Sequence, residues 1–318
     1  MSLDFDSARL PNPHLTEEHH AWREALRRFV DTEIMPYADD WDEAGAIPNT
    51  LWPKAAAVGL LGLGYPEQFG GTPADSWHSW IVNEELSRVG VGGVSASLMV
   101  HGIGLPPVLN WGPEEMQAEV ALPVLRGEKW ISLGITEPGG GSDVANLATT
   151  AIRDGDHYVI SGSKTYITGG MRANWVSTAV RTGGPGAAGV SMLLIPTDAD
   201  GFSRTPLDRK MGWWASDTAT LYLDEVRVPV ANLIGAENEG FRVIMTNFNS
   251  ERMGMAAAME AYARVCLEEA VAWATERETF GKRLADHQVI RHKIARMKQQ
   301  RIATQAYIRF CYESIEAG

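Results

Sequence analysis

The spacing of apolar residues changes twice along the chain, and this change constrains the fold more than any other feature. Over residues 16–126 apolar side chains recur every three or four positions, as in amphipathic helices. Over residues 130–228 they tend to alternate with polar ones, which is typical of β-strands, and Asp154-Gly155 reads as a hairpin turn. From Gly235 onward the helical spacing returns. We therefore predict an α+β multidomain protein.

This pattern divides the chain into three predicted domains. They are an N-terminal helical bundle over residues 1–127, a middle antiparallel β-barrel or sandwich over 128–230, and a C-terminal helical bundle over 231–318. The expected helices lie near residues 15–41, 48–58, 74–89, 92–109, 113–126, 237–275 and 284–317. The expected strands lie at residues 157–168, 174–180, 190–196 and 218–228.

Composition narrows the class of protein. The 318 residues, 45% hydrophobic and 21% charged, are typical of a globular protein with more than one core. We expect no membrane span, no secretory signal and no metal site. A net charge of −12 argues against a nucleic-acid partner. The only cysteines, Cys266 and Cys311, give no disulfide framework, which fits the cytoplasm, although buried thiols are equally ordinary packing residues.

Two glycine-rich segments carry most of the functional information. Residues 130–143 (WISLGITEPGGGSD) begin as a strand and break at Glu137-Pro138 into a loop with three consecutive glycines. Glycine lets a backbone approach a bulky ligand closely, and free N–H groups in such a loop can bind an anion. Residues 163–170 (SKTYITGG) form a strand that ends in another glycine pair. A surface turn between strands is the alternative interpretation of the first segment.

These segments, with two later ones, resemble the motifs of the flavin-dependent acyl-CoA dehydrogenases. The later ones are KMGWWASDTATLYLDEVRVP at residues 210–229 and ERETFGKRLADHQVIRHKIA at 276–295. The four motifs occur in the family's order, and the resemblance covers essentially the whole chain. It implies FAD held in an extended form between the β domain and the C-terminal helices. Because relatives continue well beyond this ending, we expect the C-terminal bundle to be truncated.

The resemblance assigns flavin contacts on the β domain. Thr136 is expected to hydrogen-bond the pyrimidine end of the ring, and Ser142 to meet the pyrophosphate or the thioester. Tyr166 and Thr168 are expected to cover the ring, although a half-buried strand aromatic and a strand-end threonine are the alternative. The implied contacts are Leu133, Ile135, Thr136, Gly141, Ser142, Tyr166, Ile167 and Thr168.

A second implied cofactor cluster comprises Arg277, Thr279, Phe280 and Gln288, where one helix stops at Gly281 and the next begins. A guanidinium makes paired bonds to phosphate oxygens, so Arg277 suits a pyrophosphate. In the family this cluster reaches the FAD of a neighbouring subunit, which implies a homotetramer built from dimers. The alternative is that Arg277 pairs with Glu276 or Glu278 in solvent.

Glu251 is the predicted catalytic base. The resemblance offers two places for this carboxylate: most relatives use a glutamate on a loop beyond residue 318, whereas isovaleryl- and long-chain-type enzymes use one on the first long C-terminal helix. Glu251 matches the helix position. An apolar setting raises the pKa of a carboxylate toward that of a working base. The alternatives are an ion pair with Arg252 or a neighbouring helix, and a further carboxylate beyond residue 318.

A further set of residues concerns the CoA portion of the substrate. The resemblance implies thioester or pantetheine contacts for Ser142, Arg242, Asn249 and Arg252. Arg204, Arg209 and Lys210 are candidates for the CoA phosphates, although lone basic residues usually only meet solvent.

The leading hypothesis is therefore FAD-dependent α,β-dehydrogenation of an acyl-CoA to the 2,3-enoyl-CoA. An electron-transfer flavoprotein is the expected electron acceptor. One alternative is an acyl-CoA oxidase or a nitroalkane oxidase, and another is a catalytically silent partner subunit of a mixed oligomer. The helix-borne glutamate and the segment at residues 210–219 favour long-chain or branched acyl groups.

Overall fold

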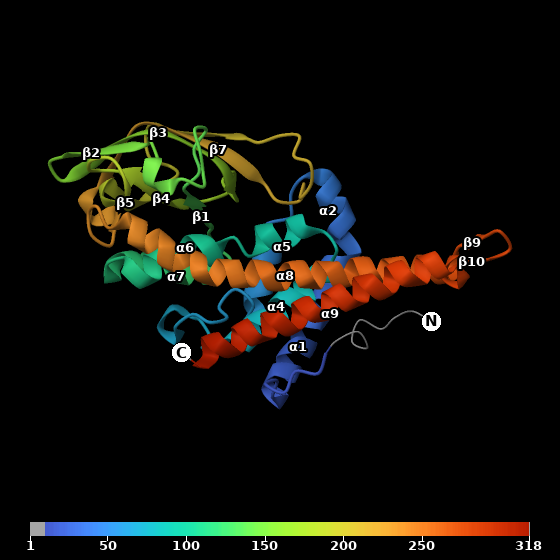
Figure 1. Cartoon of the computed structure of the whole chain (residues 1–318). Helices are drawn as coiled ribbons and strands as arrows, with labels where there is room; N and C mark the ends of the chain where they lie inside the picture. The colour runs from blue at the N-terminus through green and yellow to red at the C-terminus, as the bar shows by residue number, and fades with distance from the viewer. Residues whose placement is uncertain (1–9, 318) are drawn as a thin grey trace. The chain divides into compact units, whose positions relative to one another are not determined.

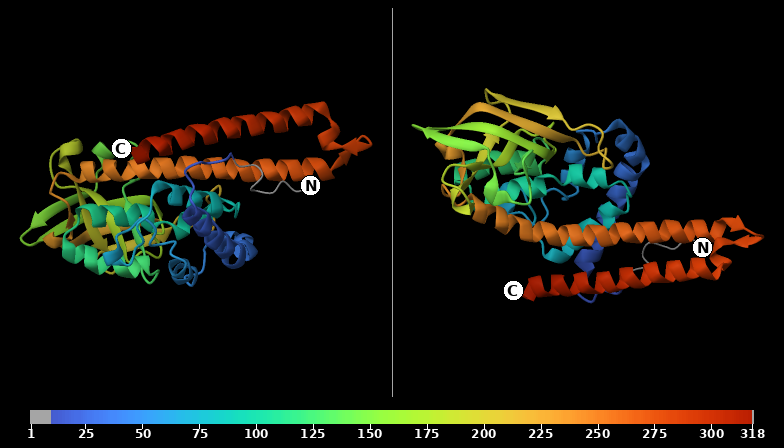
Figure 2. Two further views of the ribbon diagram at one scale, coloured as in Figure 1. Left: turned by 90° about the horizontal axis from the view of Figure 1, so that it is seen from below. Right: turned by 45° about the horizontal axis from the view of Figure 1, so that its top comes forward.

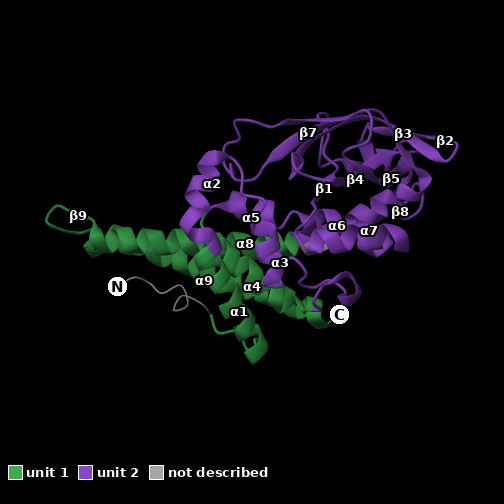
Figure 3. Ribbon diagram, turned by 180° about the vertical axis from the view of Figure 1, so that it is seen from behind, with its two compact units in different colours: residues 1–32, 74–90, 252–318 green, residues 33–73, 91–251 purple. Residues whose placement is uncertain are grey.

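The computed structural model describes residues 10–317, without the side chains of Asn249 and Ser250. It divides the chain into two compact units (Figure 3). Unit 1 comprises residues 1–32, 74–90 and 252–318, and unit 2 comprises residues 33–73 and 91–251.

Unit 1 is helical. It contains α1 (Glu17–Phe29), α4 (Ser76–Ser87), the C-terminal part of α8 (Gly240–Glu276) and α9 (Gln288–Ala317). Helices α8 and α9 run side by side in opposite directions, joined by a hairpin of β9 (Glu278–Thr279) and β10 (Lys282–Arg283) (Figures 1 and 2).

The core of unit 1 combines aromatic rings with buried charge. Trp77, Trp80 and Tyr312 pack against one another, with ring centroids 4.9–5.9 Å apart. Arg301 and Glu260 pair at 2.8 Å between α9 and α8, and both side chains are buried. Each charge is buried with its partner, so removing either side chain would leave an unpaired charge between the two helices.

Unit 2 is built on an eight-stranded sheet with the order β6-β7-β3-β2-β4-β5-β8, while β1 pairs with β4. Its neighbours are antiparallel, except that β1 and β2 each run parallel to β4. The strands are β1 (Ile131–Gly134), β2 (Thr150–Asp154), β3 (His157–Thr168), β4 (Trp175–Arg181), β5 (Val190–Pro196), β6 (Phe202–Pro206), β7 (Thr218–Pro229) and β8 (Leu233–Ile234).

The helices of unit 2 are α2 (Ala38–Ala44), α3 (Leu51–Ala57), α5 (Gly92–Leu98), α6 (His101–Trp111), α7 (Glu114–Leu125) and the start of α8. Leu105 of α6, Val124 of α7 and Ile244 of α8 share one buried cluster with strand residues that include Ile131 and Met192. One face of the sheet therefore packs on helices. The central strands are buried on the other face too, where Val180 and Leu193 belong to a second apolar cluster.

Two long predicted helices are interrupted. The one expected over residues 15–41 ends as α1, passes through a π turn and a 3-10 turn that contains Pro36, and resumes as α2. Proline lacks an N–H and clashes with the preceding turn, which explains a break at that point. The helix expected over residues 92–109 is divided into α5 and α6.

One stretch bears on the expectation that the chain has no membrane span. Gly92–Trp111, which contains α5 and α6, is long and apolar enough to cross a membrane. A core helix passes the same test, and 56% of the apolar 18-residue window within this stretch is buried in the fold.

Gly127 provides a test of the packing of unit 2. Its φ is +71°, and a Cβ there would lie 2.5 Å from the carbonyl carbon of Trp52. We predict that Gly127→Ala lowers the free energy of unfolding by about 3 kcal/mol, because backbone strain and a clash add. The measurement is urea denaturation followed by tryptophan fluorescence. Gly184→Ala, where a Cβ meets nothing within 4 Å, is the control and should change stability by less than about 0.5 kcal/mol; equal losses would contradict this explanation.

Candidate active site

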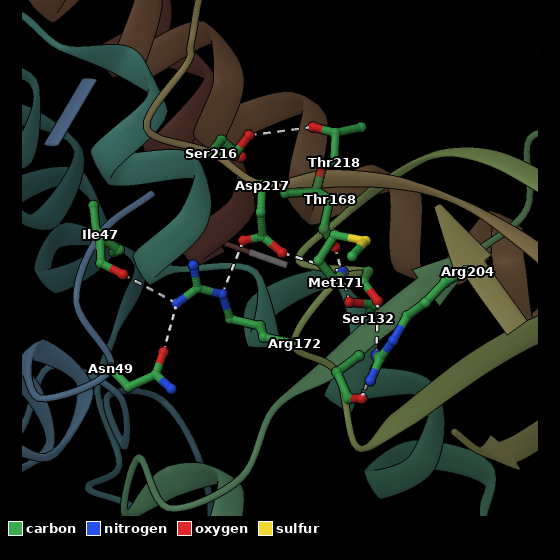
Figure 4. Close-up of polar contacts among 12 residues, drawn as sticks. Ile47, Asn49, Ser132, Thr168, Met171, Arg172, Arg204, Ser216, Asp217 and Thr218 are labelled. Atoms are coloured by element: carbon green, nitrogen blue, oxygen red, sulfur yellow. Dashed lines mark hydrogen bonds and ion pairs between the residues drawn. The ribbon is translucent and has the colours of Figure 1, made fainter. Parts of the chain in front are cut away.

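The two predicted flavin segments lie side by side in unit 2. The Ser132 hydroxyl donates to the Thr168 carbonyl at 2.8 Å (Figure 4). The Thr165 N–H donates to the Thr136 carbonyl, also at 2.8 Å. Residues 132–136 therefore run antiparallel to residues 165–168, and the side chains that the sequence assigned to one ligand come from adjacent backbones.

The glycine loop turns tightly and leaves open space beside it. Glu137 and Gly140 exchange both N–H···O bonds, each 3.0 Å long. Neither Gly139 nor Gly140 has a positive φ, and a Cβ on either would meet nothing within 4 Å. The packing of the chain itself therefore does not require glycine at these positions. Glycine at these positions leaves room for a ligand to approach the backbone closely.

Tyr166 lies on a β-bulge that turns its ring outward. The register between β3 and β7 shifts between Lys164 and Ile167, and Tyr166 has a φ of +59°, rare for an aromatic residue. Its side chain is 64% exposed, whereas Ile167 is buried. Bulges re-aim side chains beside functional sites, and backbone strain often marks such sites. An exposed, fixed aromatic ring suits a flat ligand.

Several hydroxyl groups on the two predicted flavin segments are available to a ligand. Within the part of the chain that the structure describes, no side-chain hydrogen bond engages the hydroxyls of Thr136, Thr168 or Ser142. Thr136 and Thr168 are half-buried, and Ser142 is exposed. A flat aromatic face with hydroxyls beside it and an open glycine turn fits a ring with polar edges, as in an isoalloxazine. Ile135 is buried, and Leu133 packs on the same apolar cluster. Gly141 leaves room for Thr136, because a Cβ on Gly141 would lie 3.0 Å from the Thr136 side chain.

Glu251 is held by a neighbour on its own helix. The Asn247 side-chain amide donates to the Glu251 carboxylate at 2.7 Å and to the Ile103 carbonyl of α6 at 3.1 Å. Asn247 is buried, so it fixes the direction of the half-buried glutamate. Met245 and Phe248 of the same helix pack on the cluster that contains Ile135. Glu251 thus belongs to the same packed body as the glycine loop.

The predicted substrate residues are placed differently from one another. Arg242 is exposed, and its guanidinium lies 5.1 Å from the ring centroid of Trp111. Arg252 is exposed and lies in unit 1, and the side chain of Asn249 lies outside the described residues. Arg204 instead donates to the Gly170 and Ala173 carbonyls, and Lys210 donates to the Trp213 and Ser216 carbonyls. The structure therefore gives Arg204 and Lys210 roles in holding the backbone.

The second predicted cofactor cluster lies in unit 1, at the β9–β10 hairpin. Phe280 and Gly281 both have positive φ, as a two-residue hairpin turn requires, and Phe280 is 97% exposed. The Thr279 hydroxyl contacts His287 at 3.4 Å, and Gln288 begins α9. Among residues 10–317 no ion pair joins Arg277 to Glu276 or Glu278. This hairpin replaces the simple stop and start of helices that the sequence predicted.

Comparisons with known proteins identify the family. Models of three acyl-CoA dehydrogenase domains match the chain: the N-terminal domain at residues 16–128, the middle domain at 132–226 and the C-terminal domain at 238–318. The chain is 33% identical over 302 residues to the mitochondrial long-chain specific acyl-CoA dehydrogenase of Rattus norvegicus, covering 94% of this chain and 70% of the rat protein. The chain belongs to the acyl-CoA dehydrogenase family.

Solved structures of this family share the fold. A probable acyl-CoA dehydrogenase from Mycobacterium abscessus has a TM-score of 0.93 and 47% identity over 95% of this chain and 81% of its own. A glutaryl-CoA dehydrogenase from Mycobacterium smegmatis, solved in complex with FADH2, has a TM-score of 0.87 and 27% identity over 94% of this chain and 76% of its own. The predicted family, fold class, FAD cofactor and enzyme class are confirmed.

One ion pair of this acyl-CoA dehydrogenase was missed from the sequence. Lys164 Nζ lies 2.7 Å from the Glu137 carboxylate, with Lys164 fully buried and Glu137 8% exposed. Burial lowers the pKa of Lys164 to about 8, although Glu137 opposes this shift. Burial alone would raise the pKa of Glu137, but hydrogen bonds from Lys164, Thr149 and Ala148 lower it to about 2. Both groups are therefore charged at neutral pH.

A second polar node lies beyond Thr168 (Figure 4). Asp217 accepts hydrogen bonds from the Met171 N–H and from Arg172 Nε. Arg172 also donates to the Ile47 carbonyl and to the Asn49 side chain, and it stacks on Trp52. This node ties the turn after β3 to the segment before α3. No motif in the sequence predicts this node, because its residues come from three separate parts of the chain.

The charge pair predicts a defined effect of pH. Glu137→Gln should lower the free energy of unfolding by about 3 kcal/mol at pH 7, because Lys164 is left buried without its counter-charge. The pKa of Glu137 is lowered in the fold, so its stabilisation is complete above its ordinary pKa of 4.5 and is lost as the pH falls toward 2. The difference in the free energy of unfolding between parent and variant should therefore be smaller at pH 3.5 than at pH 7, by about 1 kcal/mol.

Urea denaturation at the two pH values measures this difference. Asp154→Asn, which removes an exposed carboxylate paired with Arg227, is the control and should have little effect at pH 7. A Glu137 variant as stable as the parent at pH 7 would refute the importance of the pair.

Proposed function

We propose that Glu251 is the base of the acyl-CoA dehydrogenation and that FAD lies against Tyr166, with Thr136 and Thr168 as its hydrogen-bonding partners. The observation that carries this proposal is the outward Tyr166 bulge beside uncommitted hydroxyls, in the same packed unit as the buried Asn247 that holds Glu251. Bound FAD supplies the hydride acceptor that protein side chains lack.

Residues of this chain are proposed to remove the proton, orient the base and bind the substrate. Glu251 removes the proton beside the thioester carbonyl, and Asn247 keeps its carboxylate in one orientation through a 2.7 Å bond. The base and the flavin must face opposite sides of the acyl chain, which makes positioning as important as basicity. Ser142, Arg242, Asn249 and Arg252 are the proposed contacts of the thioester and pantetheine.

The proposal extends to partners. We assign Arg277, Thr279, Phe280 and Gln288 to the FAD of a neighbouring subunit in a homotetramer. The ring of Phe280, 97% exposed at the tip of a tight hairpin, is open to a neighbouring subunit and supports this assignment. An electron-transfer flavoprotein is the proposed electron acceptor, and the cytoplasm the proposed location.

The proposed substrates are long-chain or branched acyl-CoA thioesters. The position of Glu251 on the first long C-terminal helix supports this class, as does the 33% identity to the rat long-chain enzyme. Titration with acyl-CoAs of different length and branching, followed by flavin bleaching, ranks them. Oxygen consumption during turnover without a dye would point instead to an oxidase.

Replacing the base tests the assignment. Glu251→Gln should retain bound FAD but lose at least about 10²-fold in the rate of anaerobic flavin bleaching by acyl-CoA, because no other group takes the proton. Stopped-flow absorbance at the flavin bands measures this rate. Glu239→Gln, an exposed glutamate just before the same helix, is the matched control and should bleach like the parent. Undiminished bleaching by Glu251→Gln would move the role of base to another residue.

A further inference from the structure

The Glu137–Lys164 ion pair takes no part in the proposed proton or hydride transfer, yet it lies between the two flavin segments. Lys164 Nζ donates to the Glu137 carboxylate at 2.7 Å and to the Ile135 carbonyl at 3.2 Å. The next residue of β3 completes the set, since the Thr165 N–H bonds the Thr136 carbonyl. Three consecutive residues, 135 to 137, are therefore held by Lys164 and Thr165.

The same carboxylate also holds the far end of the glycine loop. Glu137 accepts the N–H of Thr149 at 2.9 Å and, through its other oxygen, the N–H of Ala148. The loop that carries Gly139 to Ser142 begins at Glu137, and the backbone after it, at Ala148 and Thr149, is hydrogen-bonded to the Glu137 side chain. The same side chain is bonded to Lys164 of β3.

The bulge in β3 explains how Lys164, a residue within a strand, can bond the Glu137 carboxylate and the Ile135 carbonyl. Lys164 pairs in register with Leu221, and Ile167 with Ala219, so two residues of β3 oppose only Thr220 of β7. The extra residue releases the Thr165 N–H toward Thr136 and turns Tyr166 to the outside, while Lys164 stays fully buried. The inward lysine and the outward tyrosine are two results of one backbone irregularity.

We propose that Glu137 and Lys164 are positioning residues that set the spacing between Thr136 and the Tyr166 ring, and thereby the affinity and electronic environment of the bound flavin. This inference rests on the proposed function, because it assumes that FAD lies on those residues. A buried charge pair is suited to this task, because its partners have one arrangement in which every donor and acceptor is satisfied.

The test compares Lys164→Met with Val226→Ala. Lys164→Met keeps the apolar stem and removes the charge. Val226→Ala makes a cavity in the same sheet, among residues packed on Tyr158 and Ile160, and does not alter the hydrogen bonds of residues 135–137. Apoprotein of the full chain is titrated with FAD by flavin fluorescence, and the absorbance spectrum and reduction potential of the bound flavin are recorded.

We expect Lys164→Met to raise the Kd for FAD at least tenfold and to shift the flavin spectrum or potential, and Val226→Ala to change the Kd less than twofold with a parental spectrum. Parental affinity and spectrum in Lys164→Met, or the same loss in Val226→Ala, would overturn the proposal. If Lys164→Met does not fold, the double variant Glu137→Gln/Lys164→Met takes its place, because it leaves no buried charge unpaired. Parental FAD affinity in the double variant would also overturn the proposal.

A second readout separates this inference from the assignment of the cofactor site. Amide hydrogen exchange of the apoproteins should be faster over residues 135–149 in Lys164→Met than in Val226→Ala, because the loop loses its attachment to β3. Equal exchange in the two variants would overturn the positioning role without any reference to FAD. A parent protein that does not bind FAD would instead refute the proposed site, whatever the exchange shows.

Discussion

The geometry of the candidate active site depends on a charge pair buried beneath it. Lys164 and Glu137 lie 2.7 Å apart, with Lys164 fully buried. Taking two such charges out of water is costly, and only good geometry with additional hydrogen bonds compensates for it. Here Ile135, Ala148 and Thr149 supply those bonds from the backbone. Any displacement of the glycine loop from β3 would therefore break several bonds to buried charges at once.

The two polar nodes of unit 2 act on neighbouring parts of the same surface. The charge pair holds residues 135–137, and the Ser132 hydroxyl holds the Thr168 carbonyl. Beyond Thr168, Asp217 and Arg172 fix the turn that follows β3 (Figure 4). The start of α8 is joined to this surface by apolar packing, since Phe248 rests on the cluster that contains Ile135. A rigid support of this kind suits a reaction that depends on the placement of a base against a ring.

The sequence predicts the fold better than it predicts what holds the site together. The change of apolar period located the β-rich middle of the chain, and the glycine segments identified the two backbones that meet. Helix breaks such as the one at Pro36 depend on local backbone geometry, which the spacing of apolar residues over a long window does not reveal. The strand β6 (Phe202–Pro206) was missed because it is short and largely exposed.

The alternation of residues in β3 is a sequence signal from which the buried position of Lys164 could have been predicted. In β3 the alternation of buried Tyr158 and Ile160 places Lys164 on the inward side, and a charge at such a position needs a partner. Glu137, in the other glycine segment, is the acidic residue that meets this need. The partners of Asp217 could not be found in this way, because Arg172, Asn49 and Ile47 meet only through the tertiary fold.

A crystal structure of the FAD-bound protein would show directly whether the flavin lies on this surface. We predict density for the isoalloxazine ring against Tyr166, with polar ring atoms within hydrogen-bond distance of the Thr136 and Thr168 hydroxyls and the Lys164–Glu137 pair intact beneath them. Density for the ring at another place in the molecule, or side chains of the protein itself filling the space beside Gly139 and Gly140, would contradict it.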